Sequence, residues 1–358
     1  MLTGIKKNNI ANMTMGILLL VISLNILVPE LIINAPESFI HLTATTFPLM
    51  FVFGPLMYFY TLFKTNKITH LKKSDVLHVV PALICLLLVT PFLFQPASVK
   101  LDFFEQCSTE GLPTILVIGW LIECMHIITY LLLASLEILR FHKSIKTQRS
   151  NVDTVNLRWL FKLLITNELV WWAYVGIFIL YLMGAGKEGF MASYYIFSYL
   201  TSGMVYVIGY AALKHPEIYQ HDVKEKKYEK SGLTEQIAAQ YYQDLVNFMN
   251  LNKPYQKNDL TLNQLADLLG IHPNHLSQVI NEFSHKNFFD FINHYRIEAA
   301  KEMLSEPDQD NTIIEIAYAV GFNTKSTFNA AFKKNTGTTP SVFKRSHNSK
   351  VGQTAISS

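Results

Sequence analysis

Residues 265–280 read LADLLGIHPNHLSQVI, and residues 316–332 read IAYAVGFNTKSTFNAAF. Each stretch has an Ala four residues before a Gly, and the two copies lie 51 residues apart. A small Ala lets two helix backbones cross closely, and the Gly suits the left-handed residue that ends a helix. Each copy therefore predicts two short helices joined by a tight turn, which is the helix-turn-helix arrangement.

The helix after each turn carries a pair of apolar residues four positions apart. Leu276 is followed by Ile280 in the first copy, and Phe328 by Phe332 in the second. One Ala-x-x-x-Gly pattern is a weak indication of DNA binding, but two in-phase copies with the same flanks favour it over a plain helical bundle. Between the copies, residues 287–304 keep an apolar helical face over about 25 Å. Such a linker helix predicts two recognition helices in successive major-groove faces, about 34 Å apart.

The front of the chain has a different composition. Half of all residues are hydrophobic and 16% are charged, whereas soluble globular chains carry about 25% charged residues. Six apolar runs are each long enough, at roughly 20 residues, to cross a hydrocarbon core. A large buried helical core is the weaker alternative, because the connections are short. We therefore predict an all-α fold, in which a polytopic transmembrane domain of about six spans precedes a soluble helical domain with two helix-turn-helix units. The runs are approximately 13–33, 39–63, 76–94, 114–139, 157–183 and 190–213.

Basic residues between the runs predict the topology, because Lys and Arg resist translocation across a membrane. Sixteen of them lie before the first run, after the second, around the fourth connection and after the sixth, whereas the opposite side has only Lys100 and Lys187. We expect a multi-pass protein of the inner cell membrane with both termini in the cytoplasm. The predicted domains are a membrane sensor domain (1–213), a juxtamembrane linker (214–231), a DNA-binding domain (232–346) and a disordered tail (347–358).

The segment from Leu262 to Arg345 resembles the DNA-binding domain of the AraC/XylS family of bacterial transcription regulators. The resemblance rests on IAYAVGFNTKSTFNAAFKKNTGTTPSVFKR (316–345) and on FINHYRIEAAKEML (291–304), which matches the family's linker-helix signature. The stretches FPLMFVFGPLMYFY and VLHVVPAL resemble the membrane part of membrane-bound members. The resemblance implies a one-component regulator that binds promoter DNA, in duplex form and sequence-specifically, in response to an unknown small-molecule or membrane signal.

The resemblance also assigns roles to residues. The family's base-reading positions fall on Asn274, Ser277, Gln278, Lys325, Ser326, Thr327 and Asn329. Phosphate contacts are expected from Lys286, Asn287, Arg296, Lys333, Lys334 and the backbone near Thr339. Arg296 has an equal alternative as a partner in an intradomain salt bridge, and each reader has the alternative of a solvated polar side chain. From Gly232 on, the chain has eleven Lys or Arg residues and twelve Asp or Glu residues. Binding by one chain should therefore be weak and should be rescued by a homodimer on paired half-sites.

Ionisable groups inside spans are costly, so each is a candidate for function. The candidates for intramembrane sensing are Glu123, His126, Asn167 and Glu168. Metal binding is the weaker alternative, since one Glu-x-x-His needs ligands from other helices, and hydrogen bonding between helices is the other. Because the sequence holds no catalytic constellation, we expect no enzyme, no cofactor and no metal. The main alternative function is a membrane transporter or channel with a cytoplasmic helical module for regulation or oligomerisation.

Overall fold

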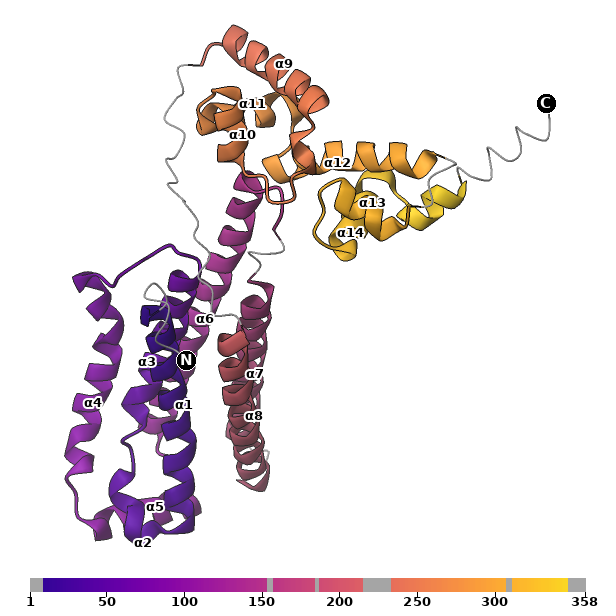
Figure 1. Cartoon of the computed structure of the whole chain (residues 1–358). Coiled ribbons are helices and arrows are strands. Elements are labelled where there is room, and N and C mark those ends of the chain that lie inside the picture. Colours follow the sequence, from indigo (N-terminus) through magenta and orange to yellow (C-terminus); the bar gives the residue numbers. More distant parts are fainter. Residues whose placement is uncertain (1–8, 153–156, 184–186, 215–232, 307–310, 347–358) are drawn as a thin grey trace. The chain divides into compact units, whose positions relative to one another are not determined.

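The computed structural model describes residues 9–152, 157–183, 187–214, 233–306 and 311–346 (Figure 1). These residues form helices and turns, and the described part of the chain contains no β-strand beyond one isolated bridge. The chain divides into two compact units. The first comprises Met1–Arg140 and Leu157–Val223, and the second comprises Phe141–Asn156 and Lys224–Ser358. The predicted all-α fold class, with apolar helices before a helix-turn-helix region, is confirmed.

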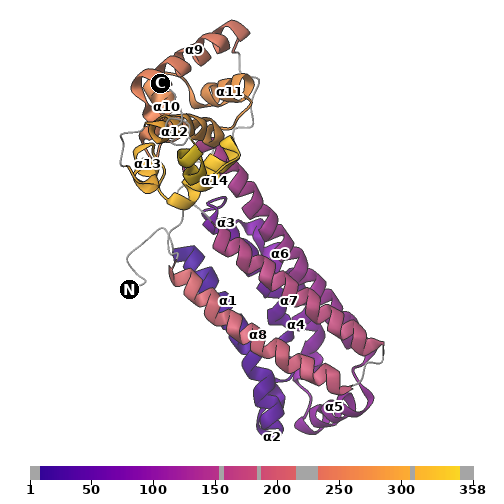
Figure 2. The same cartoon turned by 90° about the vertical axis from the view of Figure 1, so that its right-hand side faces the viewer.

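The first unit is a bundle of long apolar helices. Within it, α1 packs against α3 and α8, α3 against α4, and α7 against α8 (Figures 1 and 2). The helix α6 continues past this unit, and its residues 141–148 belong to the second. The helices are α1 (Asn9–Asn34), α2 (Pro36–Phe39), α3 (Phe47–Lys64), α4 (Val80–Leu93), α5 (Ala97–Glu110), α6 (Thr114–Gln148), α7 (Arg158–Leu182) and α8 (Lys187–Lys214), with 3-10 turns η1 (Ile40–Leu42) and η2 (Lys73–Val79).

Five helices among the described residues are long and apolar enough to cross a membrane. They are Ile10–Asn34, Phe47–Lys64, Lys73–Leu93, Thr114–Gln148 and Arg158–Leu180. The sixth predicted run folds as α8, some of whose side chains lie outside the described residues.

Two features of the first unit differ from the predicted runs. The second helix starts at Phe47 rather than at Phe39, with Pro48 in its first turn, where a missing N–H costs no hydrogen bond. The helix α5 lies in a connection for which no helix was predicted.

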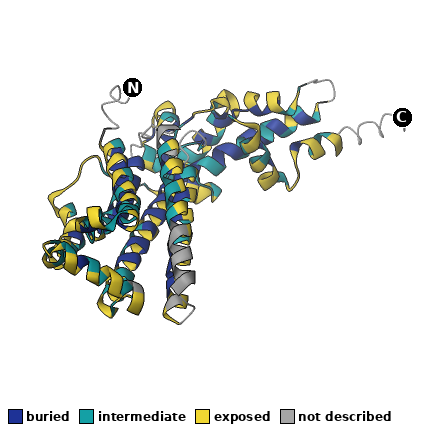
Figure 3. Ribbon diagram, turned by 90° about the horizontal axis from the view of Figure 1, so that it is seen from below, coloured by how far each residue is buried: buried dark blue, intermediate teal, exposed yellow. Residues whose placement is uncertain are grey.

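Large apolar side chains on the first unit are exposed. Leu87 is 72% exposed, Leu88 is 76% and Phe94 is 85%. Figure 3 shows helices with a buried stripe on one side and exposed residues on the other. Soluble proteins seldom leave so much contiguous apolar surface in water. This exposure therefore suits helices that are surrounded by lipid.

Six α-helices of the second unit, α9 to α14, each begin at a side-chain cap. The caps accept a hydrogen bond from a backbone N–H in the first turn, which satisfies a donor that the helix itself leaves unpaired. His272 does this through Nδ1. The other caps are Thr234, Thr261, Asn287, Thr312 and Thr324. The helices are α9 (Glu235–Asn252), α10 (Leu262–Leu269), α11 (Pro273–Ser284), α12 (Phe288–Ser305), α13 (Ile313–Ala319) and α14 (Lys325–Thr336), with the 3-10 turn η4 (Pro254–Gln256).

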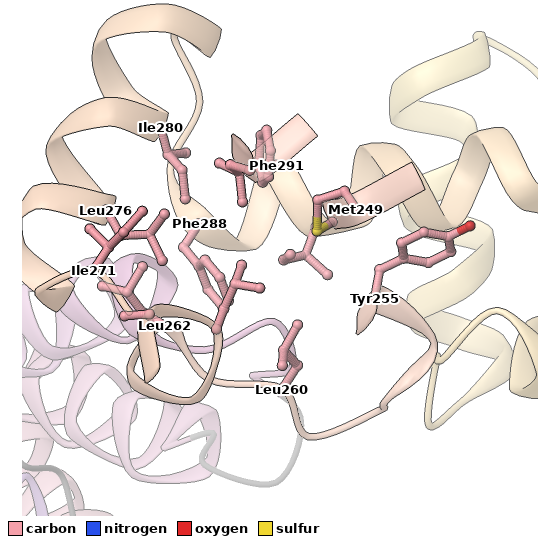
Figure 4. Close-up of a cluster of buried hydrophobic side chains, with 13 residues drawn as sticks. Met249, Tyr255, Leu260, Leu262, Ile271, Leu276, Ile280, Phe288 and Phe291 are labelled. Carbon is pink, nitrogen blue, oxygen red and sulfur yellow. The ribbon is translucent and has the colours of Figure 1, made fainter. Parts of the chain in front are cut away.

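The helix α12 contributes to two separate cores. Phe288, Phe291 and Ile292, in its first half, pack with residues of α9, α10 and α11 (Figure 4). Ala300 and Leu304, in its second half, pack with residues of α13 and α14. This is the linker role predicted for residues 287–304. The predicted tail (347–358) and, except for Lys214, the predicted juxtamembrane linker (214–231) lie outside the described residues.

Candidate nucleic-acid interface

Two helix pairs with the same construction form the candidate interface. α10 ends at Gly270 and is followed by α11, while α13 is followed by Gly321 and α14. Both glycines have a positive φ, +66° at Gly270 and +99° at Gly321, a conformation that a side chain with a Cβ disfavours. The turns therefore explain the Gly that recurs 51 residues apart, and the segments predicted as recognition helices fold as α11 and α14.

The predicted base readers lie on the open faces of these two helices. Asn274, Lys325 and Ser326 are exposed, and the other four are half-buried. The apolar positions of the same helices, Leu276 and Phe328, have 0% exposure. The side chains that point away from the core therefore reach solvent, as contact with base edges requires.

Hydrogen bonds along α11 engage part of its polar face. The Gln278 Nε2 donates to Glu282 Oε1 at 2.8 Å, and the Asn281 Nδ2 donates to the Ser277 carbonyl at 2.8 Å. Glu282 is exposed and carries a negative charge on the face that would meet DNA. For Gln278 to pair with a base, its amide has to exchange this carboxylate for the base edge.

The predicted phosphate contacts fall into two groups. Lys333 and Thr339 are exposed and Lys286 is half-buried, so their side chains reach solvent. The other three, Asn287, Lys334 and Arg296, have partners inside the domain. Lys334 Nζ lies 2.7 Å from Asp290 Oδ1, and Asn287 Oδ1 accepts from the Asp290 N–H at 2.9 Å as the cap of α12. A phosphate would have to compete with Asp290 for Lys334.

Arg296 lies in the interior of the domain. Its side chain is 1% exposed, and burial lowers the pKa of its guanidinium to about 10. Its Nε donates to the Tyr255 carbonyl at 2.7 Å, its Nη2 to the Lys257 carbonyl at 2.9 Å and its Nη1 to the Ser150 carbonyl at 3.1 Å. A buried guanidinium with these partners is not placed to contact a phosphate. The contacts favour the intradomain alternative, with carbonyl oxygens in place of the carboxylate of a salt bridge.

Ser150 is a residue that the sequence did not single out. Its N–H and its hydroxyl both donate to the Leu260 carbonyl, at 3.1 Å and 2.7 Å. Its hydroxyl also accepts from Arg296 Nη2 at 3.2 Å, and its neighbour Arg149 forms an antiparallel bridge with Thr261. The segment after α6 is thereby docked on the first helix-turn-helix unit. Since Ser150 and Arg296 are 146 residues apart, no local pattern could have indicated the contact.

The second helix-turn-helix unit meets the same junction. A Cβ built on Gly321 would lie 2.6 Å from the Tyr255 carbonyl oxygen and 3.0 Å from Arg296 Nε. The Arg296 guanidinium carbon lies 5.5 Å from the centre of the Phe322 ring, within reach of a cation–π interaction. Arg296 therefore connects the segment after α6, the turn η4 and the second helix-turn-helix unit.

The structure brings together two of the four intramembrane candidates. Glu123, on α6, and Asn167, on α7, are both 5% exposed and line one cavity in the first unit. His126 and Glu168 are absent from the lining of that cavity. Neither ring nitrogen of His126 has a hydrogen-bond partner among the described residues. The same residues contain no cluster of three or more His, Cys, Asp or Glu that could hold a metal ion.

Comparison with known proteins matches the C-terminal part of the chain. A family described as "Helix-turn-helix domain" matches residues 265–346. The chain is 34% identical over 92 residues to the uncharacterized HTH-type transcriptional regulator YijO of Escherichia coli (strain K12), covering 26% of this chain and 32% of that protein. It is 33% identical over 81 residues to the HTH-type transcriptional regulator GlxA of Rhizobium meliloti (strain 1021), covering 23% and 24%.

One relative and one solved structure show larger coverage of the matched protein. The uncharacterized HTH-type transcriptional regulator in the cgkA 5'region of Pseudoalteromonas carrageenovora is 34% identical over 26% of this chain and 53% of its own length. The C-terminal domain of AraT, a response regulator from Geobacillus stearothermophilus, is 31% identical over 32% of this chain and 88% of that one, with a TM-score of 0.26. The chain thus covers only about a quarter to a half of the length of these curated relatives.

Proposed function

We propose that this chain, which carries an AraC-type helix-turn-helix domain at its C-terminal end, is a membrane-embedded transcription regulator that binds promoter DNA sequence-specifically. The observation that carries the proposal is the pair of helix-turn-helix units, each with a glycine turn and a recognition helix whose polar face is open. The helix-turn-helix family model matches residues 265–346, and the chain is 33–34% identical over 81–92 residues to HTH-type transcriptional regulators of E. coli and R. meliloti. A recognition helix of this kind places its first turns against base edges in the major groove.

Five apolar helices support the second half of the proposal, the position in a membrane. The excess of Lys and Arg on one side of the runs favours cytoplasmic termini, which puts the helix-turn-helix domain on the side of the DNA. The near-neutral charge of this domain favours a homodimer, because two weak half-site contacts engaged together bind far more tightly than either one alone. A reporter fused after Ser231 should report a cytoplasmic position, and an external position would contradict this topology.

A route for coupling is supported by the contacts of Ser150. α6 is one continuous helix from Thr114 to Gln148, and the two residues after it pair with Leu260 and Thr261 at the start of α10. A shift of α6 would thereby reach the first helix-turn-helix unit through hydrogen bonds, and through Arg296 it would reach the second. The signal would act on the pairing or spacing of two DNA-binding domains.

The test is selection of genomic DNA by the full chain in lipid nanodiscs. Fragments retained by the protein should be enriched for one sequence with two half-sites, and protection from cleavage should cover both. The variant Gln278→Ala/Lys325→Ala should lose the enrichment while keeping the helical content of the wild type. If wild-type protein retains all duplex fragments equally at low salt, the proposed regulator function is wrong.

A further inference from the structure

We infer that the cavity in the first unit is a binding site for a small organic ammonium ion, with the Glu123 carboxylate as its counterion. The inference deepens the proposed sensing role and rests on it, because it names the class of signal that the membrane part would take. All the described lining residues of the cavity belong to the first unit.

The cavity has the size of a small-molecule site. Its volume is about 310 Å³, at the lower end of the range of roughly 300–1,000 Å³ that such pockets span. Five helices line it: α1, α3, α6, α7 and α8. A site shared by five helices can couple a ligand to their packing, since a ligand that prefers one arrangement shifts the bundle toward it.

Among the described lining side chains, Glu123 is the only ionisable one apart from the phenol of Tyr174. It is 5% exposed, and neither a hydrogen bond nor an ion pair to its carboxylate is found within the described residues. The described lining contains no Lys, Arg or His. A buried charge without a partner is strongly unfavourable, and an opposite charge at the same place removes that cost. A cationic ligand would supply the missing partner.

Aromatic rings form one wall of the cavity. The Trp120 ring centre lies 5.0 Å from that of Tyr174 and 4.1 Å from that of Phe178. The Trp171 ring centre lies 6.3 Å from that of Phe53 and 6.4 Å from that of Tyr174. The faces of Trp, Tyr and Phe attract cations, with Trp the most effective. A carboxylate beside a wall of aromatic rings is therefore a site for an organic cation rather than for an anion.

The polar lining groups narrow the class to ammonium ions that carry N–H. Asn25 Nδ2 donates to the Val21 carbonyl at 3.0 Å, and Asn167 Nδ2 donates to the Leu163 carbonyl at 3.3 Å. Each amide thus engages its own helix through nitrogen, which leaves the Oδ1 atom to accept. Together with the Glu123 carboxylate, these oxygens form a set of acceptors. A primary ammonium group, with three donors, complements such a set better than a quaternary one.

The cavity lies toward one end of the bundle. Thr46, Phe47, Leu112 and Leu116 stand at the starts of α3 and α6, and Pro29 stands near the end of α1. The basic residues that predict the cytoplasmic side lie at the other ends of these helices. With the proposed topology, the ligand would reach the cavity from the outer face of the membrane.

The test measures binding to the full chain in nanodiscs of neutral phosphatidylcholine, by quenching of tryptophan fluorescence. The probes are 2-phenylethylammonium, the neutral 2-phenylethanol and the anionic 3-phenylpropanoate. We expect saturable binding of the ammonium ion and weaker binding of the other two. Glu123→Gln should weaken ammonium binding by at least about tenfold, since it removes one partner of a buried charge pair.

Glu168→Gln is the matched control. It also neutralises an acid in the first unit that is 8% exposed, but Glu168 does not line the cavity, so ammonium binding should stay as in the wild type. Trp120→Leu should weaken binding of the ammonium ion more than binding of the alcohol. Three results would overturn the inference: no saturable ammonium binding, equal binding of the alcohol, or equal losses in both Glu variants. These outcomes do not depend on DNA, so they are separate from a failure of the proposed regulator function.

Discussion

Arg296 joins three segments that are far apart in the sequence. Its guanidinium donates to the carbonyls of Ser150, Tyr255 and Lys257, and it lies against Phe322. Carbonyl oxygens can replace part of the hydration that a buried guanidinium loses, since each bond is charge-assisted. At the residue scale, this side chain is therefore structural, and its five fixed donors suit several acceptors in different directions.

Arg296→Met should destabilise the second unit by about 3 kcal/mol or more, because three carbonyls lose a charged donor. Hydrogen exchange of the full chain measures this through the opening free energy of amides in α12. Lys333→Met is the control: it removes an exposed cation from α14 and should leave these amides as protected as in the wild type. Unchanged protection in Arg296→Met would contradict the structural role.

The two turn glycines should respond differently to Ala. Gly270→Ala should cost about 1–2 kcal/mol, the price of a left-handed conformation for a residue with a Cβ. Gly321→Ala should cost more, because its Cβ would lie 2.6 Å from the Tyr255 carbonyl oxygen, whereas nothing lies within 4 Å of a Cβ on Gly270. Thermal unfolding measures the loss of stability in each variant. Equal losses would mean that the contact between a Cβ at position 321 and the Tyr255 carbonyl oxygen relaxes easily.

At the scale of elements, the helices of the second unit are short and depend on their ends. α10 and α13 have eight and seven residues, too few to be stable alone in water. Each starts with a capping box, formed by Thr261 with Gln264 and by Thr312 with Glu315. The backbone and side chain of Thr312 hydrogen-bond the Glu315 carboxylate and lower its pKa. α12 then carries both helix pairs by sharing its length between two cores.

Substitutions on the proposed recognition helices should distinguish sequence-specific contacts from general contacts to DNA. Gln278→Ala and Lys325→Ala should each cost about 1–3 kcal/mol on the selected sequence and relax specificity there. Lys333→Ala should weaken binding to all sequences alike. It should also reduce the slope of log affinity against log salt concentration by about one. Titrations of full-length protein with specific and random duplexes at several salt concentrations measure both effects. If Gln278→Ala lowers the affinity for specific and random duplexes equally, Gln278 is not a base reader.

At the scale of the whole molecule, the chain connects its two units more than once. One connection is α6, which begins in the first unit and ends in the second. The residues after it, Arg149 and Ser150, pair with Thr261 and Leu260. The segment 141–156 therefore belongs to the second unit, although composition alone assigned it to the membrane domain.

Ser150→Pro should release this segment, because proline has no N–H to donate to the Leu260 carbonyl. Hydrogen exchange should become faster across residues 255–262 and stay unchanged in α14. Ser150→Ala is the graded comparison: it loses the hydroxyl bonds but keeps the backbone one, so its exchange should lie between those of the wild type and Ser150→Pro. Identical exchange in all three proteins would show that the segment is not docked.

The sequence by itself determined the helices and the class of the domain. Apolar runs, caps and the repeated Ala-x-x-x-Gly are local patterns, and each reflects a requirement of a single helix or turn. They predicted the all-α fold, both helix-turn-helix units and the linker helix. The polar faces of α11 and α14 followed from the same periodicity, and the candidate readers on them followed from the family resemblance, so neither needed tertiary information.

The tertiary structure alone decided what holds the two helix-turn-helix units to each other and which polar groups share a site. Arg296 proved to be buried because its partners come from residues 39 to 146 positions away. Glu123 and Asn167 share a cavity, whereas His126, three residues from Glu123 on the same helix, does not line it. Spacing along a helix fixes a side chain's direction but leaves open which neighbour it meets, since that depends on how the helices pack.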